Sequence, residues 1–499
     1  MTVPQAPAPL PKADAAAGDE AVGDEAAGSE AAAAGILRRQ RARESSARTY
    51  ARSFPIVPVR AKGMTIEGTD GRRYLDCLSG AGTLALGHNH PVVLEAIQRT
   101  LASGAPLHVL DLATPEKDDF TDALFDTLPK DFADRARIHF CGPAGTDAVE
   151  AALKLTQTAT GRRGVLAFTG AYHGMTAGAL AVTGNVAAKE RVAGGSGSAA
   201  DVTRLPYPFP YRCPFGVGGE RGAELSAAYT ERLLDDPAGG VVRPAAMIVE
   251  PVQGEGGAVP APDSWLREMR RITAERDIPL IVDEVQTGVG RTGAYWAVEH
   301  SGVKPDVMVM SKAIGGSLPL AVIVYDQDYD AWLPGAHTGT FRGNTLAMAT
   351  GAATLRYVTR HGLAERAATV GARMTARLEG LRHELPAIGD VRGRGLLIGV
   401  ELVDAEGPVD SCGAHPAAPG LAEQVRAACL DRGLIIELGG RFNATARLLP
   451  PLTITDEQAE AVLDRFTDAI AHVSAQAQTQ AQAQAPAQAQ AQARQKQGR

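Results

Sequence analysis

A lysine and an aspartate each follow an apolar run of the sequence, at a place where a side chain can act on a ligand. Lys312 comes shortly after the run PDVMVM and before the pair Gly315–Gly316, which leaves its amine open to approach. Asp283 ends the earlier run IPLIVD. A lysine amine held near an aldehyde can bond to it, and a carboxylate can keep a facing ring nitrogen protonated. The two residues therefore predict covalent chemistry on an electron-withdrawing ring.

Two further segments carry groups that could hold such a ring and a phosphate. The segment CGPAGTDAVEAALKL places Gly142, Gly145 and Thr146 just before an amphipathic helix pattern. Backbone N–H groups and the dipole at the start of a helix bind phosphate. The run GAYHGM supplies Tyr172 as a stacking ring and His173 as a further contact. Together with the lysine and the carboxylate, these groups match the needs of pyridoxal phosphate.

Three short apolar runs supply the strands that would position these residues. They are AAMIVEPVQGEGG (245–257), IPLIVDEVQTG (278–288) and PDVMVMSKAIGG (305–316). Their hydrophobicity is continuous rather than alternating, which marks strands covered on both faces, as in a parallel sheet. Between them, residues 263–277 have apolar side chains at helical spacing, and we expect Asp263 or Ser264 to cap that helix.

Strands that alternate with helices indicate an α/β fold. Ligands of such sheets bind at the carboxyl ends of the strands, where this sequence has Glu250, Asp283, Gln286 and Lys312. The predicted fold is therefore a mostly parallel sheet with the site at its carboxyl edge.

Other interpretations of single motifs are weaker. The pair Asp283–Glu284 could hold Mg²⁺ in a nucleotide hydrolase, but the required GxxxxGK[ST] loop is absent from the sequence. His88 and His90 resemble a metal pair, yet no carboxylate stands at ligand spacing near them, so a structural or rim role is favoured and no metal is expected. Arg291 could be either a substrate ligand or a turn residue with a local salt bridge.

Composition excludes several classes of function. The chain has 499 residues, 45% of them hydrophobic, and a formal net charge of −7, which argues against a nucleic-acid partner. Its five cysteines are widely spaced and form no CxxC pair, so reduced thiols are expected. The sequence shows neither an apolar run that could span a membrane nor a secretory signal pattern, and we expect a cytoplasmic protein without a membrane partner.

The two ends of the chain differ from the rest. Residues 1–35 are rich in alanine, glycine and acidic residues, and residues 474–499 are largely an Ala-Gln repeat; we expect both to be disordered. The basic stretch 37–52 is compatible with a solvated helix or a subunit contact.

Several segments, taken in order, resemble one family over residues 47–471. They are DGRRYLDCLSGAGTLALGHNHP, CGPAGTDAVEAALKL, YHGM, EPVQGEGG, LIVDEVQTGVGRTG, SKAIGG and TGTFRGN. Together they resemble the class III aminotransferases of fold type I, which use pyridoxal phosphate. For the cofactor, the resemblance implies that Lys312 bonds to the aldehyde and shuttles the proton, while Asp283 pairs with the pyridinium. Gln286 would reach the ring oxygen O3′, and Tyr172 would stack on the ring with His173 beside it.

The resemblance also implies roles at the phosphate and the substrate. Gly145 and Thr146 would hold the phosphate. Thr340 would reach the phosphate of the neighbouring subunit, which implies a homodimer. Arg447 matches an arginine that binds the α-carboxylate of glutamate or 2-oxoglutarate, and Glu255 matches a glutamate that pairs with that arginine when an amine-ended substrate is bound.

A division into two domains follows from the same resemblance. A large domain with the mostly parallel sheet is expected at 96–364. A smaller α/β domain is expected from both ends of the chain, at 36–95 and 365–473. In its second part, 363–385 has a helical pattern and DVRGRGLLIGVEL is typical of strands.

Four pieces bear on the substrate. They are GAGTLALGHNHPVV, PLHVLDLATPEKDDF, YPFPYRCPFG and KAIGGSLPLAV. These segments are most similar to the aminotransferases of the class that act on L-2,4-diaminobutyrate and 2-oxoglutarate. The resemblance implies a ping-pong reaction in which the amino group passes from glutamate to aspartate 4-semialdehyde. Another ω-aminotransferase (for ornithine, acetylornithine, 4-aminobutyrate or lysine) or a decarboxylating relative would share every cofactor residue. An inactive binding protein on this scaffold would be expected to lack Lys312 or Asp283, and both are present.

Overall fold

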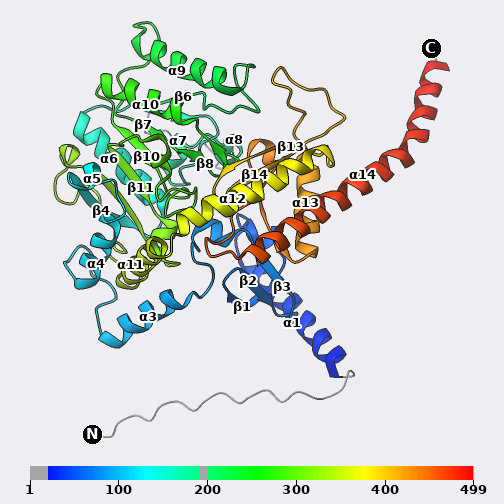
Figure 1. The fold of residues 1–499 in the computed structure, drawn as a ribbon, viewed down its shortest axis with the longest axis horizontal. Helices are drawn as coiled ribbons and strands as arrows, with labels where there is room; N and C mark the ends of the chain where they lie inside the picture. Colours follow the sequence, from blue (N-terminus) through cyan, green and yellow to red (C-terminus); the bar gives the residue numbers. More distant parts are fainter. Residues whose placement is uncertain (1–20, 191–200, 498–499) are drawn as a thin grey trace. The chain divides into compact units, whose positions relative to one another are not determined.

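The computed structural model describes residues 21–190 and 201–497 (Figure 1). The chain divides into two compact units, one within Met1–Arg60 and Ile66–Arg73 and the other within Ala61–Thr65 and Tyr74–Arg499. The first unit contains helices α1 (Ala21–Arg43) and α2 (Tyr50–Ser53). Three short strands come next in the sequence, β1 (Pro58–Lys62), β2 (Thr65–Gly68) and β3 (Arg73–Asp76).

The second unit is built on a seven-stranded sheet of order β4-β12-β11-β10-β7-β5-β6. Its strands are β4 (Ala136–Gly142), β5 (Val165–Phe168), β6 (Val202–Leu205), β7 (Ala246–Val249), β10 (Leu280–Asp283), β11 (Val307–Met310) and β12 (Ala321–Asp326). Neighbouring strands pair in parallel except at β12, which is antiparallel to both β11 and β4. The three predicted strands are thus confirmed as β7, β10 and β11, in a mostly parallel sheet.

Both faces of this sheet are covered, as the continuous apolar runs predict. In β10, Ile281 packs into a cluster with Val149 and Leu153 of helix α6 (Gly145–Thr160). Its neighbours Leu280 and Val282 belong to the other cluster. Because successive side chains of a strand point to opposite faces, each strand needs apolar residues at every position.

Helices surround the sheet, and one predicted cap is wrong. Besides α6, they include α3 (Pro91–Ser103), α4 (Pro115–Phe125), α5 (Lys130–Ala133), α7 (Ala177–Val182), α8 (Val186–Glu190), α9 (Gly219–Asp235), α10 (Asp263–Glu275) and α11 (Thr345–Arg360). The helix predicted over 263–277 is α10, but neither Asp263 nor Ser264 caps it, since Pro262 holds that position. Asp263 instead pairs with Arg394 at 2.8 Å.

A second sheet follows in the chain, of order β13-β14-β17-β16 with antiparallel neighbours. Its strands are β13 (Ile388–Arg394), β14 (Leu397–Leu402), β16 (Glu437–Gly439) and β17 (Thr445–Leu448), and its helices are α12 (Leu363–Gly380), α13 (Pro419–Asp431) and α14 (Asp456–Gln497). The helix predicted at 363–385 and the strands predicted at 390–402 are confirmed.

Short strands β8 (Val252–Gln253) and β9 (Val259–Pro260) form a hairpin, and β15 (Leu434–Ile435) pairs with β3. The predicted domain limits stay a prediction, because the second unit contains both sheets.

The structure differs from the prediction near the two ends. Helix α1 begins at Ala21, inside the segment expected to be disordered to residue 35, and α14 continues to Gln497, past the expected limit at 473. Alanine, glutamate and glutamine favour helix, and adding residues to an existing helix avoids the cost of nucleation. The predicted disorder of residues 1–20 and 498–499 lies outside the described residues.

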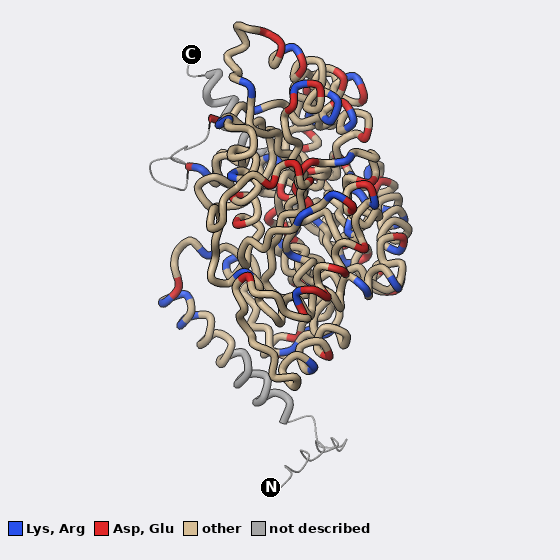
Figure 2. The backbone as a smooth tube through the Cα atoms, turned by 90° about the vertical axis from the view of Figure 1, so that its left-hand side faces the viewer, with Lys and Arg blue, Asp and Glu red and all other residues tan. Residues whose placement is uncertain are grey.

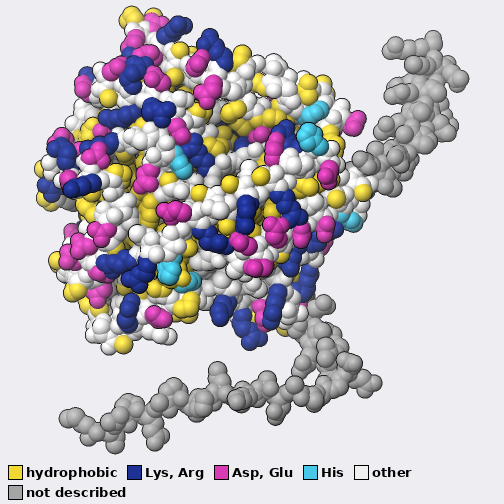
Figure 3. Space-filling model, viewed as in Figure 1, with side chains coloured by type: hydrophobic (Ala, Val, Ile, Leu, Met, Phe, Trp, Pro, Cys, Tyr) yellow, Lys and Arg dark blue, Asp and Glu magenta, His cyan; other side chains and the backbone are white. Residues whose placement is uncertain are grey.

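Charges of both signs are interspersed along the described backbone (Figure 2) and over the face drawn in Figure 3. Within the described ranges, none of the helices combines the length and apolarity that a bilayer span requires.

The close approach of α12 to the second sheet yields a stability prediction. A Cβ on Gly371 would collide with the backbone oxygen of Gly395, whereas a Cβ on Gly380, in the same helix, would meet nothing within 4 Å. We expect Gly371→Ala to lower the free energy of unfolding by about 1–3 kcal/mol, because a backbone atom must move. Gly380→Ala should leave it unchanged or raise it by up to about 1 kcal/mol. Denaturant unfolding measures both, and equal losses would contradict the packing argument.

Candidate active site

A cavity of about 260 Å³ lies at the carboxyl ends of the central strands. Most of the predicted site residues line it, namely Gly145, Thr146, Tyr172, His173, Glu255, Asp283, Gln286 and Lys312. Residues from distant parts of the sequence meet here because parallel strands bring their ends to one edge.

Lys312 follows β11 as the first residue of a short 3-10 helix, Lys312–Gly315. Its φ of 52° is left-handed, a conformation that costs a non-glycine residue about 1 kcal/mol and persists only where the surroundings enforce it. Burial lowers the pKa of the Lys312 amine and Arg447 lowers it further, while Glu255 and Asp283 oppose the shift. The amine is therefore more easily deprotonated than a surface lysine.

Asp283 is the last residue of β10, and His173 holds it in place. Asp283 Oδ2 lies 2.7 Å from His173 Nδ1, and Oδ1 accepts a hydrogen bond from the Val285 N–H at 3.0 Å. The His173 ring is buried; burial alone would lower its pKa, but the hydrogen bond and charge of Asp283 outweigh burial and raise it. The contact with His173 satisfies a carboxylate oxygen of Asp283 that would otherwise be costly to bury.

Glu284 points away from the cavity, although it is adjacent to Asp283. Its carboxylate accepts from the Thr287 hydroxyl and, at 2.8 Å, from the Val298 N–H. Burial raises the pKa of Glu284 to about 7. Among the described residues, no group of three or more His, Cys, Asp or Glu side chains is arranged to hold a metal.

The start of α6 also lines the cavity. Gly145 and Thr146 are the first two residues of this helix rather than the loop before it, and the Thr146 hydroxyl lies 2.7 Å from that of Thr176. A Cβ on Gly145 would lie 3.0 Å from Val285 Cγ1, so a larger residue here would press against that side chain. Free N–H groups of a first helical turn and a hydroxyl together suit an anion.

Glu250 connects two of the loops that carry site residues. One carboxylate oxygen accepts from the Tyr172 N–H at 3.0 Å and the other from the Gly254 N–H at 3.2 Å. Burial raises the pKa of Glu250 to about 7. The sequence placed Glu250 at a strand end but did not reveal this role, since hydrogen bonds to distant backbone atoms leave no motif.

Arg447 lies behind the cavity wall, fully buried, within a group of carboxylates. Its Nη2 donates to both oxygens of Glu255 at 2.9 Å and to Glu437 Oε2 at 2.6 Å, and its Nη1 donates to Gln286 Oε1 at 3.4 Å. The predicted arginine–glutamate pair is thus present. Glu437 was missed; an acidic residue inside the apolar run LIIEL was the available signal.

Thr340 is not in this cavity. It lines a separate one of about 280 Å³, with Gly142 and His337 among its neighbours. Its predicted action on a neighbouring subunit therefore stays a prediction.

Both histidines weighed as metal ligands have structural partners. His88 Nε2 lies 2.8 Å from Asp76 Oδ2, a nearby carboxylate that the sequence did not predict. His90 caps α3 by accepting from the Val92 N–H at 3.4 Å. The premise that no carboxylate lies near this pair is therefore wrong for His88, and the structural role of the two histidines stays a prediction supported by these contacts.

Arg291 fits neither of its two interpretations. Its buried guanidinium donates to the backbone oxygens of Leu396 and Pro450 and contributes to chain packing. Burial lowers its pKa to about 10.

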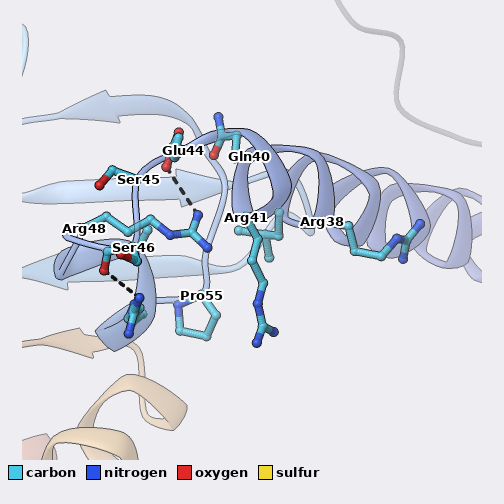
Figure 4. Close-up of a pocket in the computed structure, with 11 residues that line it drawn as sticks. Arg38, Gln40, Arg41, Glu44, Ser45, Ser46, Arg48 and Pro55 are labelled. Carbon is cyan, nitrogen blue, oxygen red and sulfur yellow. Dashed lines mark hydrogen bonds and ion pairs between the residues drawn. The ribbon is translucent and has the colours of Figure 1, made fainter.

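Another cavity, of about 610 Å³, belongs to the first unit and has a different character (Figure 4). Arginines line it, among them Arg38, Arg41 and Arg48, and Arg48 pairs with Glu44 at 3.3 Å. It contains none of the residues singled out for chemistry.

Two curated relatives resemble the chain over most of its length. The diaminobutyrate–2-oxoglutarate aminotransferase of Rhizobium meliloti is 54% identical over 85% of this chain and 90% of its own. The enzyme of the same name from Haemophilus influenzae is 48% identical over 87% and 94%.

Solved structures agree with these relatives. An amine transaminase from an uncultivated Pseudomonas species, in its pyridoxal-phosphate-bound form, has a TM-score of 0.76 and 28% identity over 86% of this chain and 98% of its own. An (S)-enantioselective ω-transaminase from Thermomicrobium roseum has a TM-score of 0.77 and 27% identity over 88% and 98%. The family model for class-III aminotransferases matches residues 46–470, and with the cavity described above this match establishes that the chain belongs to the class-III aminotransferases.

Proposed function

We propose that this protein uses pyridoxal phosphate to transfer an amino group between L-2,4-diaminobutyrate and 2-oxoglutarate. The observation that carries the proposal is the cavity in which Lys312, Asp283 and the start of α6 converge. The substrate pair is supported by the names of the two relatives at 54% and 48% identity. The protein would act in the cytoplasm as a homodimer.

The groups around the cavity fit pyridoxal phosphate. The N-terminus of α6 and the Thr146 hydroxyl suit a phosphate, the buried Asp283 suits a pyridinium nitrogen, and Tyr172 offers an aromatic face. When bound, this cofactor supplies an aldehyde that accepts amines and a ring that withdraws electrons. The protein would supply position, charge and proton transfer.

Each side chain then has a defined task. Lys312 would bond to the cofactor and afterwards carry a proton between the substrate carbon and the cofactor, which requires an amine of lowered pKa. Asp283, fixed by His173, would keep the ring nitrogen protonated. Gln286 would donate toward O3′; here its Nε2 donates to the Ala81 carbonyl at 3.1 Å.

The substrate end must accept both a dicarboxylate and an amine-ended molecule. Arg447 would bind a carboxylate of glutamate or 2-oxoglutarate through its planar guanidinium. Glu255 would leave Arg447 in that half-reaction and return to it in the other. In support, Glu255 holds Arg447 through two hydrogen bonds and remains 30% exposed on its cavity side. A different ω-aminotransferase of the class would share the cofactor residues.

Replacing Lys312 tests the cofactor assignment. Lys312→Ala should abolish transamination and the visible absorbance of the lysine–cofactor bond, because the covalent partner and the proton carrier are lost together. Circular dichroism should show an intact fold. Lys304→Ala is the matched control, because Lys304 is 38% exposed and lies outside the cavity. Wild-type turnover by Lys312→Ala would refute the assignment.

Replacing Asp283 tests the charge opposite the ring. Asp283→Asn should retain the cofactor but slow proton transfer by roughly a hundredfold or more, because a neutral amide cannot keep the ring nitrogen protonated. Rapid-mixing absorbance of single turnovers measures this step. Glu284→Gln, which removes the adjacent acid outside the cavity, should slow proton transfer far less. A larger loss in Glu284→Gln than in Asp283→Asn would mean that Glu284, rather than Asp283, faces the ring nitrogen.

Replacing Arg447 tests the substrate end. Arg447→Lys should slow the glutamate half-reaction about tenfold more than the diaminobutyrate half-reaction, since lysine lacks the planar fork. Single-turnover kinetics of each half-reaction decide it. Arg392→Lys, which alters another largely buried arginine paired with a glutamate, is the control for a general packing loss. Equal losses in both half-reactions would mean that Arg447 has only a structural role.

A further inference from the structure

Arg447 has a second carboxylate partner that sits on a strand. Glu437 of β16 lies directly opposite Arg447 of β17 in the antiparallel register, and their side chains meet at 2.6 Å. Glu437 is 12% exposed and Arg447 is fully buried. Opposite charges at paired positions of neighbouring strands are held together by the backbone ladder.

Glu255 is attached differently. It lies in the turn between β8 and β9, and its backbone oxygen accepts from the Gly440 N–H at 2.9 Å. The main chain is thus fixed while the side chain borders the cavity and is 30% exposed. Glu255 borders the cavity and has room to swing away by side-chain rotation, whereas Glu437 lies opposite Arg447 in the strand register and is only 12% exposed, which leaves its side chain less room to move.

We propose that Glu437 is a fixed second counter-ion of Arg447 and sets the balance of the site between dicarboxylate and amine-ended substrates. The inference deepens the proposed function and rests on it for the identity of the two substrates. Glu437 does not line the cavity, so it is a positioning residue that acts through Arg447.

The charges explain the effect on each substrate. With Glu255 in place, one guanidinium faces two carboxylates, and this group has a formal charge of −1. Such a group attracts the cationic diaminobutyrate. With Glu255 turned away, Arg447 still keeps Glu437, so an incoming dicarboxylate meets a neutral pair rather than a bare cation. Glu437 therefore weakens the binding of dicarboxylates and strengthens the binding of diaminobutyrate.

The test is Glu437→Gln, which removes the charge and keeps the shape. Calorimetric titration of the holoenzyme with glutarate, a dicarboxylate that cannot react, should show binding about tenfold tighter than in the wild type. The KM for diaminobutyrate should rise roughly threefold to tenfold, with a smaller change in kcat. Glu437→Asp, which keeps the charge, should return both values toward those of the wild type.

Glu401→Gln is the matched control. Glu401 is a buried glutamate of the same sheet that pairs with Arg392 and Arg212, and it does not line the cavity. The Glu401→Gln variant should have a lower melting temperature, but the ratio of its affinities for glutarate and for diaminobutyrate should equal that of the wild type. If Glu437→Gln weakens both substrates equally, or leaves glutarate binding unchanged, Glu437 is only structural and the proposal is wrong.

A second variant serves if Glu437→Gln does not fold. Glu255→Gln leaves Glu437 as the remaining counter-ion, so the diaminobutyrate half-reaction should persist with a KM raised by less than about tenfold. Complete loss of that half-reaction would overturn the proposal. If the wild type itself does not react with diaminobutyrate, the proposed substrate is wrong, but the glutarate titration still decides the role of Glu437.

Discussion

The structure depends on burying charged groups at the carboxyl edge of a sheet whose strands are apolar on both faces. Asp283 and His173 are buried there and lie 2.7 Å apart, and Lys312 is partly buried beside them. Burial lowers the pKa of Lys312, which suits a nucleophile, while Asp283 is stabilised by the His173 ring at 2.7 Å. The same burial would be costly without these partners.

The central sheet and the cofactor end of the site could be predicted from the sequence. Continuous apolar runs specify strands covered on both faces, and strands that end in Asp283 and near Lys312 must bring these residues to one edge. The start of α6 could be recognised because glycine and threonine before a helical pattern are a local signal. Each of these features is encoded in a short stretch of chain, so the sequence is sufficient to predict it.

Contacts between distant segments could not be predicted. Glu437 faces Arg447 through strand register, and Glu250 binds the backbone at Tyr172 and Gly254. Neither contact has a spacing rule, because register and loop closure are set by the whole fold. The expected cap of α10 failed for a similar reason, since Asp263 is engaged by Arg394 from a distant strand. At the ends of the chain, local helix propensity outweighed the low content of core-forming residues.

We expect Arg447, held between two carboxylates, to decide which amine this class-III aminotransferase site accepts. The most direct measurement is the kcat/KM of the purified holoenzyme with 2-oxoglutarate and each of L-2,4-diaminobutyrate, ornithine, acetylornithine, lysine and 4-aminobutyrate, with glutamate formation as the readout. Diaminobutyrate should have the highest kcat/KM, at least about tenfold above the others. A higher kcat/KM for ornithine or 4-aminobutyrate, or no glutamate from diaminobutyrate, would contradict it.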